Sequence, residues 1–331
     1  MTTHYVFASP LAPVITRYLD LMTALGRSYA TERRVFALLD AFLVAEHAPE
    51  LTLEVFERWC RTQAHLKSGN QRTQMRMVRK LCLYRRRTEP ACFVPDRAGF
   101  PPRHQHAPPY ILTEDEIARL LVTARHGAPT AAAGFRAQAL YVGVVLLYTA
   151  GLRRGELLRL TLGDYDLQAQ TLLIRTSKFH KSRLLPLSPD AMQVLDAYLA
   201  GRRARRPDTT TRAAPLIWKG GTAVHGYSGV RWSQRFHALA RQAGVLTPDG
   251  QPPRVHDLRH TFAVHALLRW YRAGVDVQAK LPFLSTYMGH VSMVSTQYYL
   301  HFIEPVAHAA SARFAQQYGA LLTPHVTEEH P

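Results

Sequence analysis

Two arginines, each in a short box of characteristic residues, could do chemistry on a phosphate. Arg153 follows Gly151 at the end of a strongly apolar stretch, so we expect it at the turn where a buried helix stops. Arg259 lies three residues after His256, and this spacing places both side chains on one face at the start of a helix. A guanidinium donates two parallel hydrogen bonds to a phosphate and keeps its proton at neutral pH. The two boxes therefore predict a phosphate-binding site.

Three further features accompany these boxes in a characteristic order. Lys178 lies between the two boxes, in the turn of an expected strand pair. After the second box, the dipeptide Gly289-His290 ends a short apolar helix, and two tyrosines stand at positions 298 and 299. The whole order resembles the tyrosine recombinase family, also known as the phage integrase family. The resemblance covers about Thr113 to His301, and its last part, residues 295–301, is similar to the family's Ser-Thr-Thr-Gln-x-Tyr-x-His ending.

The resemblance implies a mainly α fold with a small antiparallel β-sheet, in which a helical N-terminal core-binding domain precedes the tyrosine recombinase catalytic domain. It also implies a site-specific recombinase or integrase that cleaves and rejoins double-stranded DNA through a 3′-phosphotyrosine. Because the energy of the broken bond is kept in that intermediate, neither ATP nor a metal cofactor is needed. The implied catalytic residues are Arg153, Lys178, His256, Arg259, His290 and Tyr299.

Each of these residues has an expected role. The two arginines would clamp the phosphate, His256 would take the proton of the attacking phenol, and His290 would donate a hydrogen bond to the phosphate. Lys178 would protonate the departing 5′ oxygen, although its turn departs from the family's usual Gly-Lys-Gly and Lys181 lies close enough to compete. The family pattern selects Tyr299 over its neighbour Tyr298 as the nucleophile.

Two alternative functions are weaker. A metal-dependent phosphodiesterase could use His256 and His260, which are four residues apart as in helical zinc sites, but Asp257 stands where such sites carry Glu and no carboxylate cluster accompanies them. The other alternative is a catalytically silent DNA-binding accessory protein of the same fold. The intact set of catalytic residues argues against it.

The charge of the chain indicates a polyanionic partner. Its 331 residues carry a formal net charge of +17, and releasing counterions from DNA phosphates drives association of such a protein. A predicted helix over residues 70–87 concentrates this charge without one acidic residue, so it could contact a DNA groove, the alternative being a solvated basic face. The expected DNA-binding residues are Arg72, Arg76, Arg79 and Lys80 on this helix, and Lys181 in the hairpin turn.

The pattern of helices and prolines suggests two domains. We expect a helical domain over residues 1–89, a proline-rich linker over 90–109 and the catalytic domain over 110–331. Leu268 to Leu284 contains more sequence than the family usually has between its second arginine and its Gly-His, as in transposase-like branches, and Trp270 to Arg272 should lengthen a helix there. We also expect a helix from Pro189 through Leu199 and a polar loop from Gly201 to Arg212.

The remaining expectations concern the environment and assembly. Three cysteines without paired CxxC spacing suit a reducing cytoplasm, and the most apolar stretch, Ala139 to Leu152, is too short to cross a bilayer. The tail from Glu304 to Leu322 is spaced as an amphipathic helix. By resemblance, such tails dock on a neighbouring protomer, which implies a tetramer on DNA or a mixed assembly with related recombinases.

Overall fold

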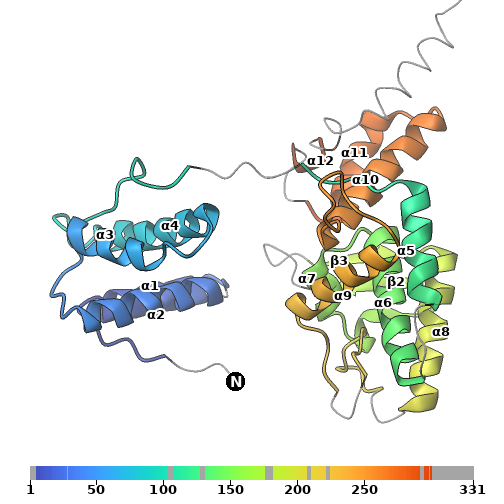
Figure 1. Cartoon of the computed structure of the whole chain (residues 1–331), viewed down its shortest axis with the longest axis horizontal. Coiled ribbons are helices and arrows are strands. Elements are labelled where there is room, and N and C mark those ends of the chain that lie inside the picture. Colours follow the sequence, from blue (N-terminus) through green and yellow to red (C-terminus); the bar gives the residue numbers. More distant parts are fainter. Residues whose placement is uncertain are drawn as a thin grey trace, which may run out of the picture. The chain divides into compact units, whose positions relative to one another are not determined.

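The computed structural model of the chain describes residues 5–27, 29–102, 108–126, 131–175, 182–206, 210–220, 224–290, 294–297 and 299. The chain divides into two compact units, Met1–Ala107 and Pro108–Pro331 (Figure 1). Helices dominate both units, and the strands form a small antiparallel sheet. The predicted fold class, mainly α with a small antiparallel sheet, is confirmed.

The first unit is built from four helices around one apolar core. They are α1 (Ala12–Ala24), α2 (Ala30–Ala45), α3 (Leu53–Thr62) and α4 (Ser68–Arg85). Apolar residues three and four positions apart bring Ile15, Phe36, Trp59 and Val78 together, each at most 1% exposed. Burial of these stripes, more than local propensity, holds the four helices together.

Part of the segment expected as a linker packs on this unit instead. Phe100 is buried in the same core, and Phe93 and Val94 lie against it. Two half-buried arginines of α4 hold the segment down, since Arg72 donates to the Pro101 carbonyl and Arg79 to the Pro95 carbonyl. The sequence does not predict this packing, because the proline-rich segment shows no periodic spacing of apolar residues. Its few large apolar side chains nevertheless pack against the core of the first unit.

The second unit begins with a helix that starts at a capping box. Thr113 and Glu116 form a reciprocal capping box, in which the Glu116 N–H donates to Thr113 Oγ1 at 3.1 Å and the Thr113 N–H donates to Glu116 Oε2 at 2.9 Å. The helices of the unit surround a continuous core. They are α5 (Glu114–His126), α6 (Ala131–Thr149), α7 (Arg154–Arg159), α8 (Pro189–Arg205), α9 (Gly229–Gln242), α10 (Val255–Arg272), α11 (Val277–Met288) and α12 (Val294–Gln297), with a 3-10 turn, η1 (Leu162–Asp164).

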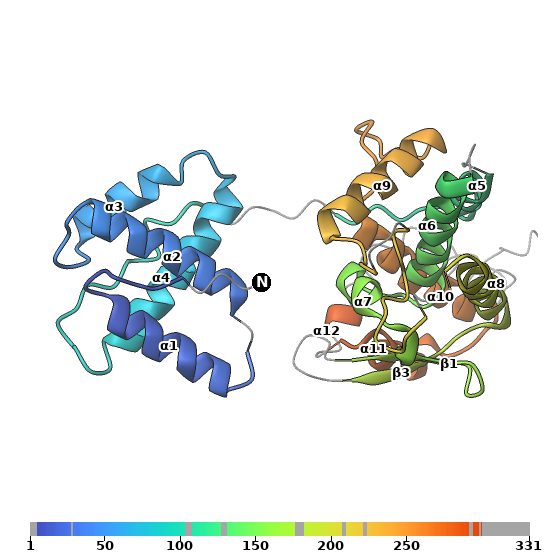
Figure 2. The same cartoon turned by 90° about the horizontal axis from the view of Figure 1, so that it is seen from below.

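The sheet has three antiparallel strands in the order β1, β2, β3. They are β1 (Tyr165–Asp166), β2 (Thr171–Ile174) and β3 (Arg183–Pro186), and Leu172 pairs with Leu185 on the buried face. Strands β2 and β3 form the predicted strand pair. Strand β1 was not predicted, because two residues are too few to show the alternation of apolar and polar side chains that marks a strand. Figure 2 shows the sheet beside α11, and the Tyr287 hydroxyl of that helix donates to the Pro186 carbonyl at 3.2 Å.

Helix α8 continues past the predicted end, so the expected loop at 201–205 was wrong. Ser188 caps its start, and the helix runs to Arg205. The extension is stabilised in the interior, because Arg202 is completely buried and donates to the carbonyls of Pro215 at 2.6 Å and Leu216 at 3.3 Å. Helix α10 also continues through Arg272, with Trp270 and Tyr271 packed beside a small cluster that it shares with α11. Over the described residues, we find no helix with the length and apolarity that a membrane span requires.

Close packing between α6 and α9 yields a test of the fold. A Cβ atom at Gly143 would lie 2.2 Å from Cη2 of the fully buried Trp232, and a ring packed on all sides cannot move away cheaply. We expect Gly143→Ala to lower the free energy of unfolding by about 1–3 kcal/mol. The matched control is Gly201→Ala in α8, where the nearest atom is 3.9 Å away. There we expect a gain of up to about 1 kcal/mol from helix propensity. Urea unfolding of the two variants measures both values, and equal effects would contradict the packing argument.

Candidate active site

Arg153 lies where the sequence predicts, at a sharp turn between two helices. Gly151 ends the turn after α6 with a φ of +58°, a conformation that suits glycine, and Arg153 is the N-cap residue of α7. The backbone N–H of Arg153 donates to Glu156 Oε2 at 2.9 Å, and its Nη1 donates to Glu156 Oε1 at 2.7 Å. This ion pair with Glu156 holds the guanidinium of Arg153 in place, while 26% of the Arg153 side chain stays exposed.

Glu156 is shared by more than one arginine. The carboxylate is 2% exposed, and Arg183 of β3 donates to Oε1 at 3.1 Å and to Oε2 at 3.0 Å. Nη1 of Arg259 lies 4.0 Å from Oε2. Burial alone would raise the pKa of Glu156, but the hydrogen bonds from Arg183 and Arg153 outweigh it and lower the pKa to about 2. A charged carboxylate therefore organises three guanidinium groups.

The same three arginines meet at the C-terminal end of α11. Three successive backbone carbonyls each accept one bond, from Arg183 Nε to Tyr287 at 2.8 Å, from Arg259 Nη2 to Met288 at 2.6 Å and from Arg153 Nη2 to Gly289 at 3.0 Å. The last carbonyls of a helix lack partners within it and carry partial negative charge, so cations are favoured there. The end of α11 is thereby tied to α7, α10 and β3.

Arg259 is the most deeply buried of the three. Its side chain is 1% exposed, and its Nη1 donates to the Gly151 carbonyl at 2.6 Å. Burial, and then the nearby charge of Arg153, lower the pKa of Arg259 to about 10, while the phenol of Tyr299 and the carboxylate of Glu156 act to raise it. The group keeps its proton at neutral pH.

His290 follows the left-handed Gly289, which ends α11 with a φ of +66°. Its Nδ1 lies 2.8 Å from the hydroxyl of the buried Thr296. Burial, followed by the charges of Arg259 and Arg153, lowers the pKa of His290 to about 3, so the ring is neutral at neutral pH. If Thr296 donates to Nδ1, the ring carries its proton on Nε2 and can donate there to an anion.

Tyr299 lies in the same cluster as the arginines and histidines. Its side chain is 2% exposed and belongs to the small core formed by α10 and α11. The ring lies 5.4 Å from the centroid of His260, in an edge contact, and 6.0 Å from that of His290, in a stacked contact. The chain thus brings the predicted nucleophile and the predicted phosphate ligands together within one subunit.

His256 packs against His260, with the two ring centroids 4.6 Å apart. Partial desolvation, and then the charge of Arg259, lower the pKa of His256 to about 4, although the residue stays exposed. A neutral imidazole at the surface can accept a proton. Asp257, by contrast, is buried and pairs with Arg254 at 2.9 Å.

Several expectations fall on residues that the structure does not describe. Lys178, Lys181 and the tail helix expected over 304–322 all lie outside the described residues. Within the described ranges, no three His, Cys, Asp or Glu side chains are grouped as a metal ion would require.

Sequence reasoning missed three residues of this site. Neither Arg183 nor Glu156 was predicted as a site residue, and Thr296 falls only within the terminal motif at 295–301. A glutamate three residues after an arginine at a helix start could have indicated the ion pair of Glu156 with Arg153. No local pattern, however, could have identified Arg183, because it is 27 residues from Glu156 along the chain.

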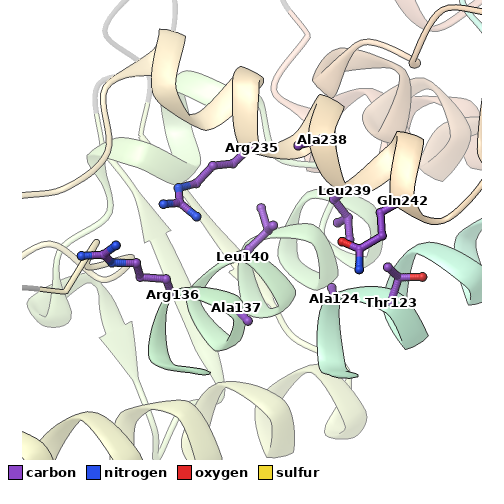
Figure 3. A pocket seen from close by; sticks show the side chains of 9 residues that line it. All are labelled: Thr123, Ala124, Arg136, Ala137, Leu140, Arg235, Ala238, Leu239 and Gln242. Atoms are coloured by element: carbon purple, nitrogen blue, oxygen red, sulfur yellow. The ribbon is translucent and has the colours of Figure 1, made fainter. Parts of the chain in front are cut away.

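A separate pocket of about 270 Å³ lies between α5, α6 and α9. Figure 3 shows Arg136 and Arg235 beside it, with Leu140 and Leu239 among the apolar residues that line it. None of the residues that line this pocket belongs to the predicted site.

The neutral histidines make stability depend on pH. Burial, and then the nearby His256, lower the pKa of His260 to about 3, as burial and arginines do for His290, from an ordinary value of 6.5. Between these values the unfolded chain binds protons that the folded chain does not, so this part of the stability is complete above pH 6.5 and is lost as the pH falls toward 3.

We expect the free energy of unfolding to decrease as the pH is lowered from 6.5 to 4. His260→Asn should reduce the proton uptake on unfolding at pH 5 by roughly one proton. Denaturant unfolding across this pH range measures the slope, with a substitution of the exposed His225 by Asn as the control. An unchanged slope in His260→Asn would show that the buried ring is not the group that titrates.

Comparisons with known proteins agree on one family. Residues 111–304 match the model of the phage integrase family. A putative integrase/recombinase of Sinorhizobium fredii, y4rB, is 33% identical over 294 residues, which cover 88% of this chain and 93% of that protein. The tyrosine recombinase XerD of Caulobacter vibrioides is 31% identical over 220 residues, 66% of each chain.

Solved structures show the same fold. The Tn1549 transposon integrase in complex with circular intermediate DNA has a TM-score of 0.61 at 18% identity, covering 91% of this chain and 99% of that one. The XerH site-specific recombinase bound to its difH substrate in a post-cleavage complex has a TM-score of 0.60 at 16% identity, over 84% and 78% of the two chains. The family match and the relatives together establish that this chain belongs to the phage integrase family of tyrosine recombinases.

Proposed function

We propose that the chain is a site-specific DNA recombinase that cuts and rejoins DNA strands through a covalent bond to Tyr299. One observation carries the proposal: Tyr299 packs within 6.0 Å of the His290 ring, on a cluster in which Arg153, Arg259 and Glu156 are tied together. The nucleophile, the cations and the hydrogen-bond donors that the reaction needs are thus gathered within one subunit.

In the proposed reaction, the Tyr299 oxygen attacks the scissile phosphorus while the bond to the 5′ oxygen breaks. The phenol proton passes to His256, which is neutral and exposed, and Lys178 gives a proton to the departing 5′ oxygen, which leaves as a hydroxyl. Arg153, Arg259 and Nε2 of His290 donate hydrogen bonds to the non-bridging oxygens as their charge grows. Each such preorganised donor typically contributes about 10²- to 10³-fold to the rate. Attack of a 5′ hydroxyl on the phosphotyrosine reverses the step and reseals the strand.

Tyr299 and Arg259 are both covered by other groups of the protein, at 2% and 1% exposure. A phosphate that contacts both must displace part of that cover. We therefore propose that entry of the DNA backbone, more than the chemistry alone, makes the site competent. This cover also keeps the nucleophile from water until a substrate is present.

Double-stranded DNA is the proposed substrate because the chain carries +17 and its solved neighbours include recombinases and integrases in complexes with DNA. We further propose integration, excision or transposition of a mobile element as its biological task. Support comes from the similarity to the putative integrase/recombinase and from the similar fold of a transposon integrase. Assembly on DNA as a tetramer, or with related recombinases, belongs to the same proposal.

A single assay separates this function from its alternatives. Wild-type protein incubated in EDTA with nicked duplex from the DNA flanking its gene should form an adduct that survives denaturation. Tyr299→Phe should form none, because its ring lacks the attacking oxygen, whereas the matched control Tyr298→Phe should still form it. Only dissociable binding by the wild type would support the accessory protein instead, and cleavage that EDTA abolishes would support a metal-dependent nuclease.

The cations of α4 should differ in their roles. Arg76 and Lys80 are exposed, whereas Arg72 and Arg79 are half-buried and occupied by backbone carbonyls. We propose that the exposed pair contacts DNA phosphates. Each of the substitutions Arg76→Gln and Lys80→Gln should then reduce the slope of log affinity against log salt by about 0.9, without altering thermal stability.

Arg72→Gln serves as the comparison for these two variants. It should instead lower the melting temperature of the first unit, because the chain near Pro101 loses its tether. Binding titrations across a salt series, paired with melting curves, measure both effects. Unchanged salt slopes for Arg76→Gln and Lys80→Gln would remove α4 from the DNA interface.

A further inference from the structure

Arg183, at the start of β3, is a buried cation for which the proposed reaction names no role. Its side chain is 11% exposed, and each of its three nitrogens donates to the protein, two to Glu156 and one to the Tyr287 carbonyl. Three of its five N–H groups are thereby used within the protein, and the side chain is almost enclosed. We therefore expect its effect to reach the phosphate through the groups that it holds.

We propose that Arg183 is a positioning residue for the phosphate-binding arginines. It joins Glu156 to the end of α11, and through these two groups it places the guanidinium of Arg153 and the turn that carries His290. The inference rests on the proposed function, because it concerns the same site. It adds a residue that does not itself touch the substrate.

Arg183 supplies half of the hydrogen bonds that the side chain of Glu156 accepts. An ionised carboxylate offers about four lone-pair positions, and four donors fill them: the N–H and Nη1 of Arg153, and Nη1 and Nη2 of Arg183. Without Arg183, half of these positions would be empty inside the protein. A buried carboxylate in that state turns toward other donors, and Arg259, whose Nη1 is 4.0 Å away, is the nearest cation available. Both phosphate ligands would then shift.

Arg183 also packs closely against Gly289. A Cβ atom on Gly289 would lie 2.7 Å from Nη1 of Arg183, so the guanidinium fills the space that a side chain would take. The Gly289 carbonyl accepts the bond from Arg153, and His290 is the next residue. Arg183 therefore supports the turn on which both groups depend.

The hairpin supplies a matched control. Arg175 follows β2 and pairs with the buried Asp164, but its own side chain is 60% exposed. Asp164 also accepts bonds from the N–H and the hydroxyl of Thr161, at 2.9 and 2.8 Å. Loss of Arg175 removes a similar ion pair from the same hairpin without disturbing Glu156.

The test compares wild type, Arg183→Gln, Arg183→Lys and Arg175→Gln in covalent adduct formation. Each is measured on nicked duplex with a natural phosphodiester and with a neutral methylphosphonate at the cleaved position. Because the neutral substrate lacks the charge that the arginines must balance, misplaced arginines should matter less for it. We expect Arg183→Gln to bind DNA as wild type does, to react about 10²-fold more slowly on the phosphodiester and to show a much smaller loss on the methylphosphonate.

Arg183→Lys should not restore the rate, because one ammonium cannot reproduce a planar fork with three engaged nitrogens. Arg175→Gln should react as wild type on both substrates. Wild-type rates for Arg183→Gln, or an equal loss on both substrates, would overturn the inference.

A second measurement does not depend on activity. In a crystal structure of Arg183→Gln, we expect Nη2 of Arg153 to leave the Gly289 carbonyl. An unmoved Arg153 overturns the inference even if the wild type proves active. Conversely, a wild type that forms no adduct overturns the proposed function, while the position of Arg153 still decides the role of Arg183.

Discussion

A carboxylate that is 2% exposed must be paired, and the pairing of Glu156 decides where the arginines of this site lie. Removing the ion from water costs several kcal/mol, so an unpaired Glu156 would be strongly unfavourable. Its pKa of about 2 indicates that the ion pairs outweigh this cost. Three guanidinium groups surround one carboxylate, which leaves an excess of two positive charges for an incoming anion.

The excess charge explains the state of the neighbouring histidines. Desolvation and the positive charge of the arginines lower the pKa of His256 and His290, so both imidazoles are neutral at neutral pH. The histidines therefore add no positive charge to the arginine cluster. The carbonyls at the end of α11 provide partial negative charge for the three arginines before any phosphate arrives. The arginines of the proposed site are therefore held in place before an anion binds, and only the cover over Arg259 and Tyr299 has to move. Electrostatic stabilisation of a transition state is largest where the charged groups need not reorganise.

The first unit uses its arginines for two purposes. Arg85 bonds to Glu50 and Glu89, and Arg72 and Arg79 hold the chain that follows α4, so these three cations are structural. Arg76 and Lys80 remain exposed on the same helix. A run of basic residues is thus not one surface, because helical periodicity turns some members toward the protein and others toward solvent.

The sequence by itself determined the family, the fold class and most helices, because apolar periodicity, capping residues and ordered boxes are local or nearly local signals. The capping box at Thr113 and the left-handed glycines at 151 and 289 are examples. Only the tertiary structure decided that Arg183 shares Glu156, that three arginines meet one helix end, and that residues 93–100 pack on α4. These contacts join residues up to 136 positions apart. A buried charge pairs with the groups that lie near it in the folded protein, and its neighbours along the sequence do not reveal which groups these are.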